Sequence, residues 1–172
     1  VIDIGGGTTE IAVMSLGGVV YSNSLRVAGD AMDNALANYM RKEYNLMIGD
    51  STAEKIKKEI GTAIATNSNT YAVKGRDLRS GTPKEVNITE DDTVEALNPI
   101  LREMINGIKD ALENTPPELS ADLVDMGLTL TGGGALLKNV DKRLSKETWL
   151  PVHIAEDPLA SIAIGTGKAL SL

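Results

Sequence analysis

The sequence predicts an α/β protein in which a mixed sheet is flanked by helices and interrupted by an inserted α+β subdomain. An apolar strand, a glycine-rich loop and two further β-rich runs open the chain. A strand–helix–strand–helix order closes it, and helices with short β-like runs lie between these two blocks. Because helices pack on the faces of such a sheet, we expect a main subdomain at 1–28 and 91–172 and an inserted subdomain at 29–90.

The first three strands follow from short β-rich runs. Residues 1–4 are apolar except for Asp3 and lead directly into a loop rich in glycine. The runs Glu10–Ser15 and Val19–Val27 are separated by Leu16-Gly17-Gly18, and this arrangement predicts a β-hairpin.

The middle of the chain predicts two helices and a small β excursion. Asp30 is expected to cap the first helix. Ser51, followed three residues later by Glu54, is a capping-box pattern for a second helix that runs to about Ile64. Residues 66–88 are rich in polar residues and glycine, and we expect them to form a solvent-facing β excursion.

A long helix and a closing α/β unit complete the expected order. Thr89 is expected to cap the long helix, and Pro116-Pro117 is expected to end it. After a strand at 128–130, the turn Thr131–Gly134 leads into an expected helical face formed by Ala135, Leu136, Val140 and Leu144.

The last expected elements are a strand and a helix. Val152–Ala155 forms a short β-like run. Asp157-Pro158 is a strong helix start, a cap followed by a proline at the first helical position, for a helix that runs to about Leu170.

The composition is that of a folded globular protein. Hydrophobic residues make up 42% and charged residues 24% of the 172 residues, which is near the average for globular domains. The net charge is −7 and no dense basic run is present, so nucleic acid is not expected as a partner. The absence of cysteine is typical of a reducing compartment, and we expect a cytoplasmic protein.

No stretch of the sequence is a candidate membrane span, because none approaches the length of about 18 apolar residues that a bilayer requires. The chain begins directly on a strand of the buried type, Val1–Ile4, with no start methionine. We therefore expect that further sequence precedes Val1 in the whole protein.

The loop after the first strand is the first candidate for chemistry. In Asp3-Ile4-Gly5-Gly6-Gly7-Thr8-Thr9-Glu10, consecutive glycines let backbone N–H groups approach phosphate oxygens. Asp3 can hold Mg²⁺ through water, since Mg²⁺ keeps much of its hydration shell. A dinucleotide fingerprint is excluded because the loop opens a hairpin, and a Walker loop because its lysine is missing. A plain tight hairpin remains open as an alternative.

Two further motifs can carry a ligand. Gly132-Gly133-Gly134 stands between a strand and a helix, where a ligand can lie against bare backbone; a close helix–strand crossing explains it equally well. Glu54, Lys57 and Lys58 lie at i, i+3 and i+4 on one helix face, where they can hold a ribose and flank an adenine. A solvated helix with a weak salt bridge is the alternative.

The joint occurrence of these motifs resembles the actin, heat-shock chaperone and sugar kinase ATPase superfamily over residues 1 to about 170. Within it the chain is similar to the bacterial actin-like ATPases of the MreB family. Ala28 is one departure, because many relatives have a glycine there. Six segments carry the similarity to that family: Asp3–Glu10, Leu16–Ser22, Thr52–Lys57, Pro116–Leu119, Thr131–Leu137 and Ala155–Leu159.

The resemblance implies a site for ATP or ADP with Mg²⁺. Asp3 would face the metal through water, and Glu10 would stand near the attacking water. The residues implied to bind the nucleotide are Gly5, Gly6, Gly7, Thr8, Thr9, Gly29, Glu54, Lys57, Lys58, Gly132, Gly133, Gly134 and Leu136.

The resemblance also implies a cytoskeletal function. The whole protein would polymerise head to tail into filaments and govern cell shape and wall synthesis. It would work with the cell-wall elongation machinery at the inner face of the membrane, with membrane contact only through an amino-terminal part. Because phosphoryl transfer needs electrostatic clamping from all sides and the chain matches only the second of two domains, we expect this chain alone to be inactive.

Two other functions within the superfamily remain open. A chaperone-type ATPase would need a peptide-binding domain after Leu172. A small-molecule kinase would need a substrate-activating carboxylate from the other domain.

Overall fold

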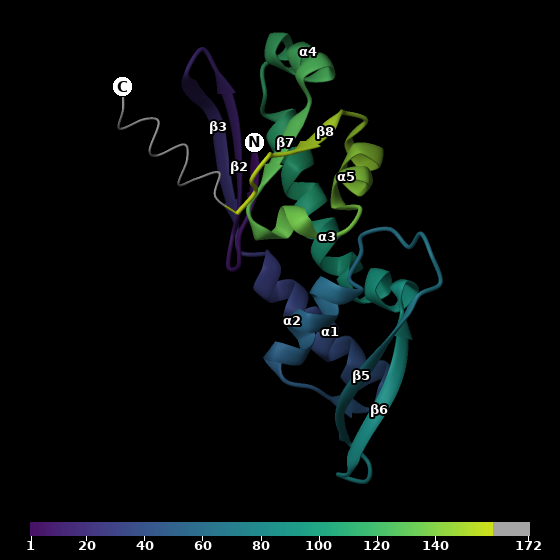
Figure 1. The fold of residues 1–172 in the computed structure, drawn as a ribbon. Helices are drawn as coiled ribbons and strands as arrows, with labels where there is room; N and C mark the ends of the chain where they lie inside the picture. Colours follow the sequence, from purple (N-terminus) through teal and green to yellow (C-terminus); the bar gives the residue numbers. More distant parts are fainter. Residues whose placement is uncertain (160–172) are drawn as a thin grey trace.

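A computed structural model describes residues 1–159 and confirms an α/β fold with a mixed sheet (Figure 1). Most of the helix expected from Asp157 to about Leu170 lies outside the described residues. Among the helices of the described part, none is both long enough and apolar enough to cross a membrane.

The main sheet has five strands in the order β3-β2-β1-β7-β8. The central strand β1 (Ile2–Ile4) pairs antiparallel with β2 (Thr9–Ser15) and parallel with β7 (Leu128–Thr131). β3 (Gly18–Leu25) extends the expected hairpin on one side, and β8 (Val152–Ile154) pairs parallel with β7 on the other. Because β1 and β7 run parallel, the two glycine-rich turns that follow them leave the same edge of the sheet.

Three helices supply a large share of the core. α1 (Gly29–Tyr44) and α3 (Glu90–Glu113) pack against one another, and α2 (Asp50–Glu59) packs on α1. α3 also covers β2 and β3, and Gly107 leaves room there for the Leu25 side chain. The fully buried side chains have helical spacing on each helix: Met32, Leu36 and Met40 on α1, and Leu97, Leu101, Met104 and Ile108 on α3.

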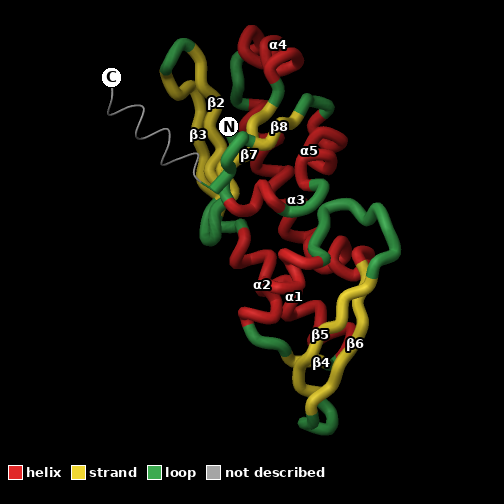
Figure 2. The backbone as a smooth tube through the Cα atoms, viewed as in Figure 1, coloured by secondary structure: helices red, strands yellow, loops and turns green. Residues whose placement is uncertain are grey.

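A second, antiparallel sheet lies at the far end of α1 and α2 from the main sheet (Figures 1 and 2). It consists of β4 (Leu46–Met47), β5 (Thr70–Asp77) and β6 (Pro83–Thr89). The expected β excursion is therefore a full hairpin of seven register pairs from Thr70 to Arg76. Figure 1 shows this hairpin projecting from the end of the molecule opposite β2 and β3.

The helix after Pro116 was not predicted, because Pro116-Pro117 was interpreted only as the end of α3. Pro117 instead occupies the first turn of α4 (Pro117–Met126), where a missing N–H group costs nothing. The expected helical face after Gly134 is also wrong in part. A 3₁₀ turn, η1 (Gly133–Leu136), ends before α5 (Val140–Thr148), and Asn139 in a left-handed conformation separates them.

Two of the expected helix caps are wrong, and one is confirmed. The residue before α1 is Ala28, and Asp30 lies inside the first turn without capping it. α2 follows Gly49 and ends at Glu59 rather than near Ile64, with no capping bond from Ser51. Thr89 does cap α3: its backbone N–H donates to Asp92 Oδ2 at 2.8 Å, and its hydroxyl accepts from the Asp92 N–H at 3.4 Å.

Tyr39 and Tyr44 fasten α1 to the first turn of α3. The Tyr39 hydroxyl donates to Asp92 Oδ1 at 2.7 Å, and the Tyr44 hydroxyl donates to Asp92 Oδ2 at 2.9 Å. Burial, together with the hydrogen bond to Asp92, raises the pKa of Tyr44 to about 12. The hydroxyl therefore remains a donor at neutral pH, and the position of α1 is fixed relative to α3.

Candidate functional site

The glycine loop after β1 is held by the first turn of α1. The Gly29 N–H donates to the Gly5 carbonyl at 3.0 Å, and the Asp30 N–H donates to the Gly6 carbonyl at 2.8 Å. Thr9 is fully buried, and its hydroxyl donates to the Val27 carbonyl at 2.6 Å. The first amides of α1 are thus used to shape the loop, and Thr9 ties the start of β2 to the segment that leads into α1.

The second glycine turn lies directly against β1. Gly132 has a φ of +84°, and a Cβ there would collide with the Ile4 carbonyl oxygen. A Cβ on Gly134 would collide with the Ile4 side chain. The close crossing considered from the sequence is therefore present, and it brings the second turn next to the first loop.

Helix α2 places its basic residues above these two turns. Lys57 Nζ lies 2.9 Å from Asp33 Oδ1 of α1 and donates to the Gly29 carbonyl at 3.2 Å. Lys58 Nζ pairs with Glu54 Oε1 at 2.9 Å. The hydrogen bond from Lys58 lowers the pKa of the Glu54 carboxyl, and the same bond raises the pKa of Lys58. Both groups are therefore charged over a wide pH range.

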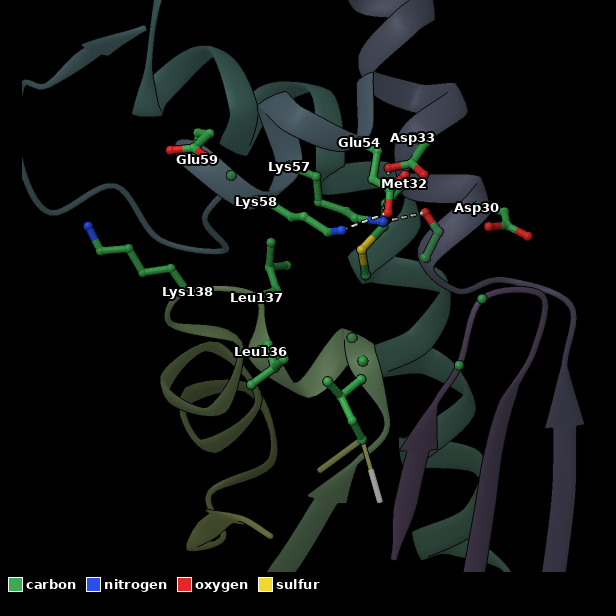
Figure 3. A pocket seen from close by; sticks show the side chains of 17 residues that line it. Asp30, Met32, Asp33, Glu54, Lys57, Lys58, Glu59, Leu136, Leu137 and Lys138 are labelled. Atoms are coloured by element: carbon green, nitrogen blue, oxygen red, sulfur yellow. Dashed lines mark hydrogen bonds and ion pairs between the residues drawn. The ribbon is translucent and has the colours of Figure 1, made fainter. Parts of the chain in front are cut away.

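A pocket of about 720 Å³ lies between α2 and the two glycine turns (Figure 3). Its volume falls within the range of roughly 300–1,000 Å³ that is typical of small-molecule sites. Figure 3 shows Lys57, Lys58 and Asp33 on one side of the space and Leu136 and Leu137 on the other. Nine of the residues expected at the site line it: Gly5, Gly6, Gly29, Glu54, Lys57, Lys58, Gly133, Gly134 and Leu136.

The other expected site residues lie behind or beside the pocket. Those that do not line it are Asp3, Gly7, Thr8, Thr9, Glu10 and Gly132. Sequence reasoning missed Met32, Asp33 and Lys138, which do line it. Asp33 stood inside the quoted motif that opens α1, three residues after Asp30, and this spacing was the available signal for it.

Asp3 and Glu10 face one another across the antiparallel pair of β1 and β2. Glu10 is exposed, and its Oε1 accepts a hydrogen bond from the Ser24 hydroxyl at 2.8 Å. Burial, and to a lesser degree the nearby charge of Glu10, raises the pKa of the Asp3 carboxyl. Two facing carboxylates are a poor arrangement without a cation, and oxygen ligands of this kind suit Mg²⁺, so the pair fits the metal implied by the resemblance.

Asp3→Asn is expected to stabilise the ligand-free protein at neutral pH. Because the pKa of Asp3 is raised from its ordinary 3.8 in the folded state, stability falls as the pH rises from 3.8 through the raised value. Removing one of two facing charges should stabilise the protein by roughly 0.5 kcal/mol at pH 7, which corresponds to a rise of about 2 °C in the melting temperature. Thermal unfolding followed by circular dichroism measures the shift, which should vanish at about pH 3.

The control for this measurement is Asp125→Asn, at an exposed position on α4. It removes one negative charge without separating a carboxylate pair and should leave the melting temperature unchanged. A lower melting temperature for Asp3→Asn at pH 7 would contradict the repulsion between Asp3 and Glu10.

A mixed sheet with two glycine turns at one edge, facing an inserted helical unit across a pocket, defines an actin-like fold. The family model described as MreB/Mbl protein matches residues 1–172 of the chain. The chain therefore belongs to the MreB/Mbl family of bacterial actin-like proteins.

Individual relatives agree with this assignment. The chain is 49% identical over 173 residues to the cell shape-determining protein MreB of Escherichia coli (strain K12), covering 100% of the chain and 50% of that relative. Crystal structures of MreB5 of Spiroplasma citri bound to AMPPNP and to ADP are 42% identical, with TM-scores of 0.93 and 0.94. They cover 96% of the chain, which spans 50% and 51% of those structures.

A more distant structure, the MamK double helical filament, shares the fold. Its TM-score is 0.77 at 21% identity, and the match covers 92% of the chain and 49% of that structure. The chain thus spans about half the length of the relatives that it matches.

Proposed function

We propose that this chain forms one half of an ATP-binding, filament-forming protein that governs cell shape. The observation that carries the proposal is the pocket in which the Gly5 loop, α2 and the Gly133 turn converge. The close structural similarity to MreB5, a relative crystallised with AMPPNP and with ADP, supports a nucleotide as the ligand.

The phosphates are assigned to the first loop. Gly6, Gly7 and Thr8 are exposed at the end of β1 and offer backbone N–H groups and the Thr8 hydroxyl as donors. The Gly5 N–H instead closes the loop by donating to the Thr8 carbonyl at 3.0 Å. We assign Thr9 and Gly29 to shaping this loop, because Thr9 is buried and the Gly29 N–H is used by the Gly5 carbonyl.

The adenosine is assigned to the space between α2 and η1. Leu136 is 59% exposed and faces this space with Gly133 and Gly134. It provides an apolar surface for a base. On the opposite wall Glu54, Lys57 and Lys58 offer a carboxylate and two ammonium groups for ribose hydroxyls. Gly132 does not line the pocket, and we assign it to the crossing with β1.

The Mg²⁺ ion, when bound with ATP, would neutralise charge on the phosphates. Asp3 is the residue assigned to hold it through water, and Glu10 is assigned to orient the attacking water. The described residues contain no group of three or more His, Cys, Asp or Glu side chains arranged to hold a metal.

The two parts of the chain are assigned different tasks. Residues 1–28 and 91–172 would form the nucleotide-binding subdomain, and residues 29–90 the inserted subdomain. Self-association into head-to-tail filaments, contact with the wall-elongation machinery and a place at the inner membrane face belong to the whole protein. The chain spans half of its relatives, and we propose that it does not hydrolyse ATP alone.

Light scattering of the whole protein tests the filament proposal. Micromolar protein should scatter more light after Mg-ATP is added, and ADP binding should be measurable by calorimetry. ATP consumption that requires an added small-molecule substrate, with no rise in scattering, would instead indicate a kinase. Absence of ADP binding would contradict the assignment of the pocket.

A further inference from the structure

The segment after α2 crosses the back of the pocket and binds to the loop after η1. We call residues 60–64 the pocket strap. The Ala63 N–H donates to the Lys138 carbonyl at 2.8 Å, and the Thr62 hydroxyl lies 3.1 Å from the same oxygen. Asn139 Nδ2 donates to the Ile64 carbonyl at 2.9 Å. Thr62 is fully buried and pairs with Lys138 as an isolated parallel bridge.

An ion pair between the buried Glu90 carboxylate and the half-exposed Lys138 side chain fixes the same place to α3. Glu90 is 2% exposed, and its Oε1 accepts from Lys138 Nζ at 2.9 Å. Its Oε2 accepts from the Asn67 N–H at 3.3 Å, so both carboxylate oxygens have donors. A buried carboxylate is tolerated only when it is paired and hydrogen-bonded. Lys138 is therefore held by its side chain and by its backbone.

The strap also lines the space that it closes. Gly61, Leu137 and Lys138 line the pocket between α2 and the Gly133 turn. α2, which carries Glu54 and Lys57, ends directly before the strap. The contact between residues 62–63 and Lys138 therefore sets the spacing between the two pocket walls.

We propose that Thr62, Glu90 and Lys138 are positioning residues that hold the two walls of the pocket at the spacing a nucleotide needs. This inference rests on the proposed nucleotide binding. When the strap separates from Lys138, α2 is no longer fixed relative to η1, and this open form does not bind the ligand. Nucleotide binding and strap closure are then linked.

Hydrogen exchange of the Ala63 amide measures this linkage directly. A ligand that binds only the closed form suppresses opening by a factor of 1 + [L]/Kd, which is about 100-fold at 100 times Kd. With the whole protein and ADP at that concentration, exchange at Ala63 should slow by about this factor. The Gly81 amide, which donates to the Asp77 carbonyl at the hairpin tip, is the internal control and should not change.

Thr62→Val tests the role of the hydroxyl, because it keeps the branched shape of the side chain and removes its hydrogen bonds. Thr62 does not line the pocket, so a loss of affinity must be indirect. ADP affinity should fall about tenfold, which corresponds to about 1.4 kcal/mol of binding free energy. Thr62→Ser keeps the hydroxyl and should restore the affinity. Lys138→Gln should also weaken binding, while Lys138→Arg should retain most of it.

The matched control is Lys74→Gln, which breaks an ion pair of 3.9 Å with Glu85 on the β5–β6 hairpin, away from the strap. It should leave ADP affinity within twofold. If the wild-type protein does not bind ADP, the proposed function fails. If ADP binds but Ala63 exchange is unaffected and Thr62→Val binds normally, the strap proposal fails and the proposed function stands.

Discussion

Gly132→Ala should lower the melting temperature of the protein by about 10 °C, which corresponds to about 3 kcal/mol in a chain of this size. At a φ of +84° a side chain is strained. The new Cβ would also meet the Ile4 carbonyl oxygen, which is backbone and cannot move aside without separating β7 from β1. Thermal unfolding measures the loss, and ADP affinity should fall with it because η1 begins at the next residue.

Gly133→Ala is the matched control, one residue along the same turn. Gly133 does not have a positive φ, and a Cβ there would lie 3.4 Å from Leu159 Cδ2, a side-chain atom. Its melting temperature should stay within about 2 °C of the wild type, because a surface substitution usually changes the free energy of unfolding by about 0.5 kcal/mol or less. Equal losses for the two variants would show that the crossing with β1 does not constrain Gly132.

The convergence of the two glycine turns could be predicted from the sequence because it follows from topology. Glycine runs at the ends of two apolar strands predict turns, and parallel neighbours place such turns at one sheet edge. Gly5 and Gly133 are thus brought together by strand order alone. The cap at Thr89 was equally local, since a threonine followed by an acid three residues later closes a capping box.

Features that depend on contacts between distant elements could not be predicted in this way. The sequence placed Lys57 on one face with Glu54, but Lys57 instead pairs with Asp33 of α1. Helical spacing describes only neighbours on one helix, and the packing angle of α2 on α1 decides which partner is reached. Lys138 could not be predicted for the same reason, because its position at the pocket depends on its ion pair with the buried Glu90 of α3.

Helix α4 was missed for a different reason. Pro116-Pro117 is compatible with the end of one helix and with the start of the next, because proline is favoured at the first helical position. Leu119 and Leu123 form a short apolar stripe at i and i+4, but they are only half-buried and α4 has no fully buried residue. The interpretation of the proline pair as a terminator was correct for α3, but it overlooked the second helix that the same pair begins.

Glu10→Gln should slow ATP hydrolysis by the whole protein by about 10²–10⁴-fold, the range for loss of a positioned base, while ADP affinity stays within about threefold. The carboxylate is exposed near the start of β2, opposite Asp3 and hydrogen-bonded to Ser24. Glutamine keeps an oxygen that accepts from the Ser24 hydroxyl, so the side chain stays in place and loses only its charge and basicity. Single-turnover phosphate release measures the chemical step apart from product release.

Ser24→Ala separates the position of Glu10 from its charge. It removes the 2.8 Å hydrogen bond to Glu10 and leaves the carboxylate intact, so hydrolysis should fall by about tenfold or less, the loss of one hydrogen bond. Because the carboxylate remains in Ser24→Ala and is lost in Glu10→Gln, Ser24→Ala should hydrolyse ATP faster than Glu10→Gln. Unchanged phosphate release in Glu10→Gln would remove Glu10 from the reaction and leave Asp3 as the carboxylate facing the water.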